Sequence, residues 1–465
     1  MNPSEDFLSL LARWPRAVEA GPFLFFGGQL GLRAGGGLCA RYADAAGQGP
    51  PVEGDSPWVE RIEGPVHAQV AAIYERLKEV LARRGGGLGH LLRLHLYQRD
   101  KRFFPVFDRV RRHYEPSSPA PSTAVGMGRF EPSGDAWLGI DGIALRPGME
   151  GEIGPRRAPG GSPAHAAAAH FSHVAGAGPY LFLAGQIPVD TSRPGAPLIR
   201  GYEDVPAEGR FLQAGRSHED FRNGPIAAQS WFTYDLIRRH LEGAGSSLDR
   251  IVNLTVYLQD MRDFPTFHRV HERFFPEAPP ALTVIQAKEV GHKGTLVEVE
   301  PTAILPGKGV GRRLIPAAGH PALGARMSLG AEAGGVLFLS GMAGVDEGGE
   351  PVADPSALPP RARRFLNERS SPPGRAELQA AAILSRLEEA LAGEGAGLGR
   401  LAHLSVFLSG IGDFPRVEPL LAGAFPGRRP AICVAEAPRP HPLEGARMSV
   451  TAIAWLGKGE PNEVR

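Results

Sequence analysis

Hydrophobic and polar residues alternate with a period of two at three places along the chain. The alternating stretches read LLRLHLYQ from Leu91, IVNLTVYL from Ile251 and LAHLSVFL from Leu401. Each follows a helical pattern that ends in glycines, and each precedes a Phe-Pro pair that opens a second helix. A period of two predicts a strand with one buried face. Recurrence at a nearly fixed spacing predicts one structural unit written three times.

The two faces of these strands are expected to differ. The face predicted to lie in the core carries Leu92, Leu94 and Leu96, then Val252, Leu254, Val256 and Leu258, then Ala402, Leu404, Val406 and Leu408. The opposite face carries Arg93, His95 and Tyr97, then Asn253, Thr255 and Tyr257, then His403, Ser405 and Phe407. Because the second set is more polar, we expect it to face surroundings that are less apolar than a core.

The remaining patterns complete the unit. Each copy begins with two strands, and the second of them contains a glycine, at Gly28, Gly185 and Gly341. A glycine inside a strand marks either the wall of a cleft, where a ligand or backbone approaches closely, or a plain bulge. A long amphipathic helix comes next, with Pro65 and Pro225 at or near its start in the first two copies, where a missing N–H costs little.

Between the strand pair and the long helix, each copy has an insertion rich in proline, glycine and charge. The insertions cover about residues 43–64, 201–224 and 351–374. Loops of this length in compact domains are usually functional or disordered. We interpret them as lids over clefts or as surface decoration.

One unit is therefore β-β-α-β-α-β-β, an α+β arrangement with two helices on one face of a sheet. The predicted boundaries of the three tandem domains are 1–148, 149–306 and 307–465. This division agrees with the domain number expected for a chain of 465 residues.

Composition narrows the range of functions. The formal net charge is +1 and the basic residues are spread along the chain, so the pattern of a nucleic-acid-binding protein is missing. Cys39 and Cys433 lie in different copies and favour a reducing compartment. The first residues show no basic leader, and no apolar run has the length of a membrane helix. We expect a cytoplasmic protein that binds neither nucleic acid nor membrane.

A cluster of histidines raises the question of a metal site. His165, His170 and His173 lie close together in the run HAAAAHFSH. Neither strand nor helix periodicity brings these three side chains onto one face, so no metal is predicted.

The motif GQIPVD, the glycine-ended helix, the stretch NLTVYLQDMRDFPTFHRVHERFF, the Pro-Ala turn and the terminal VEVE resemble the Rid family of reactive-intermediate deaminases, also called YjgF. The resemblance is clearest in the second copy. It implies a trimer of chorismate-mutase-like domains around a central barrel of sheets, with a small-molecule cleft at each interface. Three tandem copies then imply a single-chain pseudo-trimer that is a monomer in solution.

The resemblance also implies functional positions. In the family's deaminases an arginine after Pro-Ala binds the substrate carboxylate, and a glutamate on the next strand positions the hydrolytic water. The arginine position falls on Thr123, Leu282 and Ile432, so no copy keeps the arginine. The glutamate position falls on Gly139, Glu298 and Ser449, so only the second copy keeps the acid.

Three further family positions also differ from the family pattern. The asparagine of the second helix becomes Asp108, His268 and Glu418, and the aromatic residue near the first strand becomes Trp14, Phe171 and Met327. The serine before the strand glycine becomes Gly27 and Ala184, and is kept as Ser340.

Glu298 and His268 are the predicted catalytic pair, because a carboxylate and an imidazole in one cleft suit general acid-base chemistry. The alternative is that Glu298 pairs with a neighbouring cation and His268 lies on a helix face. The predicted substrate-binding residues are Thr283, Leu282, Phe171, Ala184, Gly185, Ser340 and Trp14. No cofactor is predicted, and the expected partner is a small-molecule metabolite.

Three functions are compatible with these observations. The first is a Rid-like hydrolase or deaminase that acts on a small imine, enamine or related C–N metabolite at an interdomain cleft. The second is a non-catalytic metabolite-binding or scaffold protein, which the missing arginine favours. The third is a chorismatase-like enzyme, since those enzymes share the fold and the PSTAVG turn resembles theirs.

Overall fold

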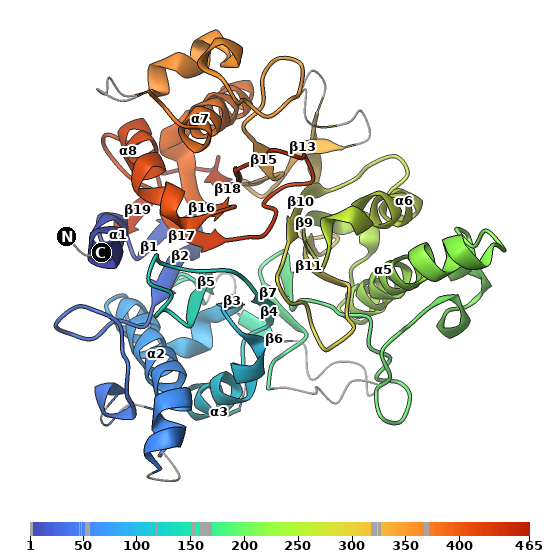
Figure 1. Cartoon of the computed structure of the whole chain (residues 1–465), viewed down its shortest axis with the longest axis horizontal. Helices are drawn as coiled ribbons and strands as arrows, with labels where there is room; N and C mark the ends of the chain where they lie inside the picture. The colour runs from blue at the N-terminus through green and yellow to red at the C-terminus, as the bar shows by residue number, and fades with distance from the viewer. Residues whose placement is uncertain are drawn as a thin grey trace.

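The computed structural model describes residues 3–465 except 46, 48, 52–55, 118, 151–154, 158–169, 318–322, 324–326 and 367–371. The predicted ranges 1–148, 149–306 and 307–465 are called the first, second and third segments below. Figure 1 shows them as three lobes around a common centre, with strands towards the centre and helices outside.

The same order of elements recurs in each segment. The first contains α1 (Pro3–Leu11), β1 (Ala17–Ala20), β2 (Phe23–Leu30), α2 (Pro57–Ala82), β3 (Leu91–Gln98), α3 (Phe104–Tyr114), β4 (Ser122–Gly126) and β5 (Leu138–Leu145). The second contains β6 (Pro155–Arg157), β7 (Val174–Ala177), β8 (Tyr180–Leu183), α5 (Ser217–Gly243), β9 (Ile251–Leu258), α6 (Phe264–Phe274), β10 (Ala281–Gln286) and β11 (Val297–Ile304).

The third contains β12 (Arg313–Pro316), β13 (Ser328–Ala333), β14 (Val336–Leu339), β15 (Met342–Ala343), α7 (Arg375–Gly393), β16 (Leu401–Leu408), α8 (Phe414–Ala424), β17 (Ala431–Glu436), β18 (Met448–Trp455) and β19 (Asn462–Val464). Apart from the extra elements α1, β6, β12, β15 and β19, each segment has the predicted β-β-α-β-α-β-β order.

The strands form two sheets. One has the order β19-β1-β2-β5-β3-β4, and the other the order β17-β16-β18-β14-β13-β10-β9-β11-β8-β7-β6. In the larger sheet the second and third segments meet where Ala281 of β10 pairs with Ser328 of β13. The fold is a mixed α+β fold with a curled sheet.

The first strand of the strand pair in each segment has an additional short strand beside it. β6 pairs with β7, and β12 pairs with β13. β1 pairs instead with β19, whose Val464 lies opposite Ala17. The two ends of the chain therefore lie close together (Figure 1).

Apolar side chains fill the space between helices and sheet in each segment, and a fourth cluster in the middle joins all three. Leu94 and Leu96 pack under the helices as predicted, and so do Leu254 and Leu404. The prediction is wrong for Leu92, Val252 and Ala402, which lie in the central cluster. The reason is an irregularity in register at the start of β3, β9 and β16, which breaks the period of two.

The insertions pack on the long helices. Short 3-10 helices at Tyr42–Ala45, Tyr202–Asp204, Ala207–Arg210 and Pro360–Phe365 lie against α2, α5 and α7. Pro65 and Pro225 do not lie at helix starts, because α2 begins at Pro57 and α5 at Ser217, both within the insertions.

Candidate active site

A cavity of about 700 Å³ lies between the first and second segments. The first segment contributes the turn at Lys101, the start of α3 and β4, and the second contributes the chain after β8, the loop at 289–294 and β11. The segments are joined here by backbone hydrogen bonds: Gly185 N donates to Ser122 O over 3.3 Å, and Gly126 N donates to Glu289 O over 2.7 Å. The cavity is therefore built from both segments and would not exist in either alone.

Glu298 lines this cavity. It stands on β11 opposite Tyr257 of β9 and is 3% exposed. A Cβ at Gly185 would lie 2.2 Å from Glu298 Oε1, so the glycine provides the room for the carboxylate. Glu298 Oε2 has no hydrogen-bond partner among the residues that the structure describes. Burial raises the pKa of Glu298 to about 7, although the Lys101 ammonium opposes the shift.

Lys101 enters the same cavity from the first segment. It begins a 3-10 turn, Lys101–Phe103, and its backbone N–H donates to Glu289 Oε2 over 2.9 Å. Its Nζ donates to Ala124 O over 2.5 Å. Burial lowers the pKa of Lys101, against the opposing effect of Glu298 and Glu289. The cavity thus holds an acid and an amine whose pKa values are shifted towards each other.

The corresponding positions in the other segments carry no charge. The turns Met261–Asp263 and Ile411–Asp413 precede α6 and α8 as Lys101–Phe103 precedes α3, and they place the buried side chains Met261 and Ile411 where the first segment has Lys101. Ser449 and Gly139 stand opposite Phe407 and Tyr97 as Glu298 stands opposite Tyr257. Among the three junctions, only the first–second junction therefore combines the lysine with the glutamate.

The other two junctions are built from different side chains. At the second–third junction Gly341 N donates to Leu282 O over 3.1 Å, and Leu282 N donates to Ser340 Oγ over 3.0 Å. At the third–first junction the Phe7 ring of α1 lies 5.0 Å from the Phe414 ring. Trp14 Nε1 donates to Glu418 Oε1 there, over 3.2 Å.

The predicted site residues are divided among these junctions. Phe171 and Gly185 line the cavity with Glu298, and Ala184 is buried directly before Gly185. Leu282, Thr283 and Ser340 belong to the second–third junction, since Thr283 lies beside Gly341 and Thr451. Trp14 belongs to the third–first junction. Sequence patterns within one segment do not show which segment completes a cleft.

His268 does not line the Glu298 cavity. It lies on α6, where its ring stacks on Phe264 at 5.4 Å and its Nε2 is 3.8 Å from Glu272. The cavity is lined by α3 instead, through Phe104 and Pro105. The predicted pairing of His268 with Glu298 in one cleft does not occur, because the helix that faces Glu298 comes from the first segment.

The strand register also changes one of the assigned arginine positions. Leu282 pairs with Leu254 and Ile432 pairs with Leu404. The equivalent Leu94 pairs with Ser122 rather than Thr123. Ser122 lines the cavity, whereas Thr123 donates a hydrogen bond to the buried Glu300.

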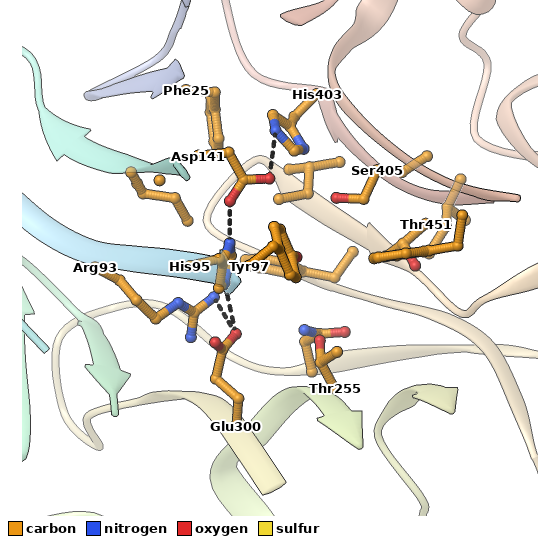
Figure 2. A pocket seen from close by; sticks show the side chains of 18 of the residues that line it. Phe25, Arg93, His95, Tyr97, Asp141, Thr255, Glu300, His403, Ser405 and Thr451 are labelled. Atoms are coloured by element: carbon orange, nitrogen blue, oxygen red, sulfur yellow. Dashed lines mark hydrogen bonds and ion pairs between the residues drawn. The ribbon is translucent and has the colours of Figure 1, made fainter. Parts of the chain in front are cut away.

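The polar face of the three alternating strands meets at the centre of the molecule, as predicted. Figure 2 shows His95 between two carboxylates, Asp141 and Glu300. His95 Nε2 lies 2.9 Å from Glu300 Oε1, and Arg93 Nη2 lies 3.2 Å from the same oxygen. His403 of the third segment lies 3.5 Å from Asp141. This cluster, which we call the barrel network, joins residues of all three segments.

Little free space lies beside the barrel network. The free space beside it is about 40 Å³, and both carboxylates are completely buried. Burial opposes protonation of His95, but Glu300 and Asp141 outweigh it and raise its pKa to about 9. The same contacts hold the pKa values of Asp141 and Glu300 below their usual range despite burial. The network is therefore a set of paired charges, and its chemistry is structural.

Two other predictions concern metal and membrane. In the described part of the chain, no group of three His, Cys, Asp or Glu side chains is arranged to hold a metal ion. His165 lies outside the described residues, His170 N donates to Asp108 Oδ1, and the His173 ring stacks on His240. No helix in the described ranges is long and apolar enough to cross a membrane.

Known proteins resemble the part of the chain that carries Glu298. The family described as endoribonuclease L-PSP matches residues 162–305. A RutC family protein of Pyrococcus horikoshii is 31% identical over 133 residues, which cover 29% of this chain and 85% of the relative. The chain belongs to the Rid/YjgF (L-PSP) family. A putative endoribonuclease of Klebsiella pneumoniae with a solved structure is 35% identical, covering 29% of this chain and 99% of that one, with a TM-score of 0.27.

The Rid/YjgF match explains part of the site. Residues 162–305 include Phe171, Gly185 and Glu298, but Lys101 lies outside the matched range. Lys101 was missed because it stands in the turn before Phe-Pro, where no pattern within one copy marks it. The signal that could have found it is the comparison of QRDKRFFP with LQDMRDFP and LSGIGDFP, in which a lysine replaces methionine and isoleucine.

Proposed function

We propose that this chain is a single-chain pseudo-trimer of three Rid-like domains, 1–148, 149–306 and 307–465, with one working cleft. The proposed reaction is the hydrolysis of a small imine or enamine at the first–second junction. Support comes from the recurring order of elements and from the combination of Lys101 with Glu298, which only the first–second junction has.

The observation that carries the proposal is the raised pKa of Glu298 together with its place in the cavity. A carboxyl group with a pKa of about 7 can accept a proton from water and return it to the leaving amine at neutral pH. Its unpartnered Oε2 and its place in a cavity of about 700 Å³ leave room for a substrate and a water molecule. In this mechanism Glu298 activates water for attack on the C=N carbon and then protonates the amine.

The test is imine hydrolysis by the wild type and by Glu298→Gln. An imino acid is generated in situ by oxidising an amino acid, and its loss is followed by trapping with semicarbazide. We expect Glu298→Gln to lower kcat/KM by about 10²- to 10⁴-fold, as expected for loss of a general acid-base group. The wild-type rate should rise through pH 7, because the carboxylate form is the base.

The control is Glu277→Gln, which changes an exposed carboxylate that does not line the cavity. Equal rates for wild type and Glu298→Gln would exclude the hydrolase. Binding of an imino or oxo acid without any turnover would instead support the metabolite-binding scaffold.

A further inference from the structure

Lys101 differs from every other lysine of the chain. The other lysines are Lys78, Lys288, Lys293, Lys308 and Lys458. All five are exposed, whereas Lys101 is partly buried in the wall of the first–second cavity. An exposed lysine is protonated at neutral pH and reacts poorly with carbonyl groups, while a desolvated lysine keeps a larger fraction of free amine.

The surroundings of Lys101 fix its amine inside the cavity. Its main chain is held by Glu289, and the hydrogen bond from Nζ to Ala124 O uses one N–H of the amine. The neighbouring walls are largely apolar and include Phe104, Phe171 and Val189. Burial in this wall lowers the pKa of Lys101, which favours the neutral amine with a free lone pair.

Glu298 stands in the same cavity and supplies the complementary group. Formation of an imine from an amine and a carbonyl needs a proton donor for the departing oxygen or nitrogen, and hydrolysis needs a base for water. A carboxyl group with a pKa of about 7 can do both. Neither Met261 with Ser449 nor Ile411 with Gly139 could do so at the other junctions.

We propose that Lys101 is a covalent Schiff-base residue that forms an imine with a small 2-oxo acid in this cavity. The oxo acid is favoured because Lys293 adds positive charge to the lining. The Nζ lone pair attacks the carbonyl carbon, the C=O bond is replaced by C=N, and the oxygen leaves as water after accepting two protons. No redox partner is required.

The role of Lys101 in turnover rests on the proposed function, imine hydrolysis at this junction. With an imine substrate, Nζ attacks the C=N carbon and ammonia leaves, so that the substrate becomes bound to Lys101. Water activated by Glu298 then attacks the new C=N carbon, and the 2-oxo acid and free Lys101 are released. Each cycle consumes one water and one imine and produces one ammonia and one oxo acid.

The experiment traps the bond. Full-length protein is incubated with pyruvate and sodium cyanoborohydride at neutral pH, and the product is analysed by intact mass and peptide mapping. We expect one adduct per chain, on the peptide that contains Lys101, with each exposed lysine modified at least about tenfold less, because only Lys101 offers a partly buried amine to the cavity. Adducts spread evenly over the exposed lysines, or no adduct at all, would overturn the proposal.

Three variants provide the controls. Lys101→Met introduces the residue that the second segment has at this position, Met261. We expect this variant to form no adduct and to unfold at a temperature close to that of the wild type. Lys101→Arg keeps the charge without the nucleophile and should also give no adduct. Lys308→Met, at an exposed lysine that does not line the cavity, should leave the adduct intact.

The outcomes separate this inference from the proposed function. If Glu298-dependent imine hydrolysis is found but Lys101→Met keeps the full rate and no adduct forms, the Schiff-base role is wrong and the hydrolase stands. If the Lys101 adduct forms but imine hydrolysis is not accelerated, the covalent site stands and the hydrolase is wrong.

Discussion

The first–second and third–first junctions use the same elements in different ways. At the first–second junction α3 and β11 border a cavity of about 700 Å³ that holds Lys101 and Glu298. At the third–first junction the side chains of Phe7 and Trp14 are buried against α8, and the corresponding residues are Ile411 and Gly139. Because all three junctions belong to one chain, each can change without changing the others, which identical subunits of a trimer cannot do.

The three segments also contribute unequally to the barrel network at the centre of the molecule. Arg93, His95 and Asp141 of the first segment carry charge, and they meet Glu300 of the second. Ser405 and Thr451, which correspond to His95 and Asp141 in the third segment, are uncharged (Figure 2). The first and second segments thus contribute most of the charged groups of the barrel network, as they contribute Lys101 and Glu298 to the cavity.

The largest expected effect comes from removing the side chain that fills the third–first junction. Phe7 is completely buried, so Phe7→Ala should lower the free energy of unfolding by about 3–5 kcal/mol, measured by urea denaturation. The imine hydrolysis rate should not change, since this junction has Ile411 and Gly139 at the positions of Lys101 and Glu298. Phe221→Ala, at a residue that is 80% exposed, is the matched control. A higher rate of imine hydrolysis in Phe7→Ala would show that the third–first junction can also act as a site, which would contradict the contrast between the two junctions.

The second effect concerns the barrel network. The pKa of His95 is raised from 6.5 to about 9 in the folded state, so its stabilisation is complete below pH 6.5 and is lost as the pH rises through 9. His95→Gln should therefore cost about 3 kcal/mol at pH 6.5 and much less above pH 9. Urea unfolding across this range measures the difference.

His113→Gln, at an exposed histidine of α3, is the matched control in the same unfolding series. A cost of His95→Gln that is constant with pH would mean that the histidine is not held protonated by Asp141 and Glu300.

The smallest effect sharpens the contrast between two glycines at corresponding positions. Gly185→Ala places a Cβ 2.2 Å from Glu298 Oε1, whereas the nearest atom to a Cβ at Gly341 is Thr283 Cγ2 at 3.1 Å. We expect Gly185→Ala to reduce kcat/KM by about 10²-fold, because it displaces the carboxylate, and Gly341→Ala to leave it nearly unchanged. Equal losses in both variants would show that the glycines have only a packing role.

The local elements could be predicted from the sequence, and the junctions could not. The alternation in β3, β9 and β16 and the Phe-Pro helix starts depend on neighbouring residues, which a pattern records. The pairing of Gly185 with Ser122 depends on which segments lie side by side, and no local pattern contains that information. For this reason Glu298, Gly185 and Phe171 were predicted for one cleft, while Lys101 was missed and His268 was placed with the wrong partner.

The pairing of β19 with β1 makes the molecule a ring with one seam. At the other two junctions the polypeptide chain links one segment to the next. The contact of residues 17–19 with 462–464 has no such link and is held by hydrogen bonds and apolar packing. The seam joins residues near the two ends of the chain, so it closes the longest loop in the fold. The entropic cost of closing this loop is therefore the largest. An opened seam also exposes two complementary strand edges, and these edges allow neighbouring molecules to exchange strands and form swapped chains at high concentration.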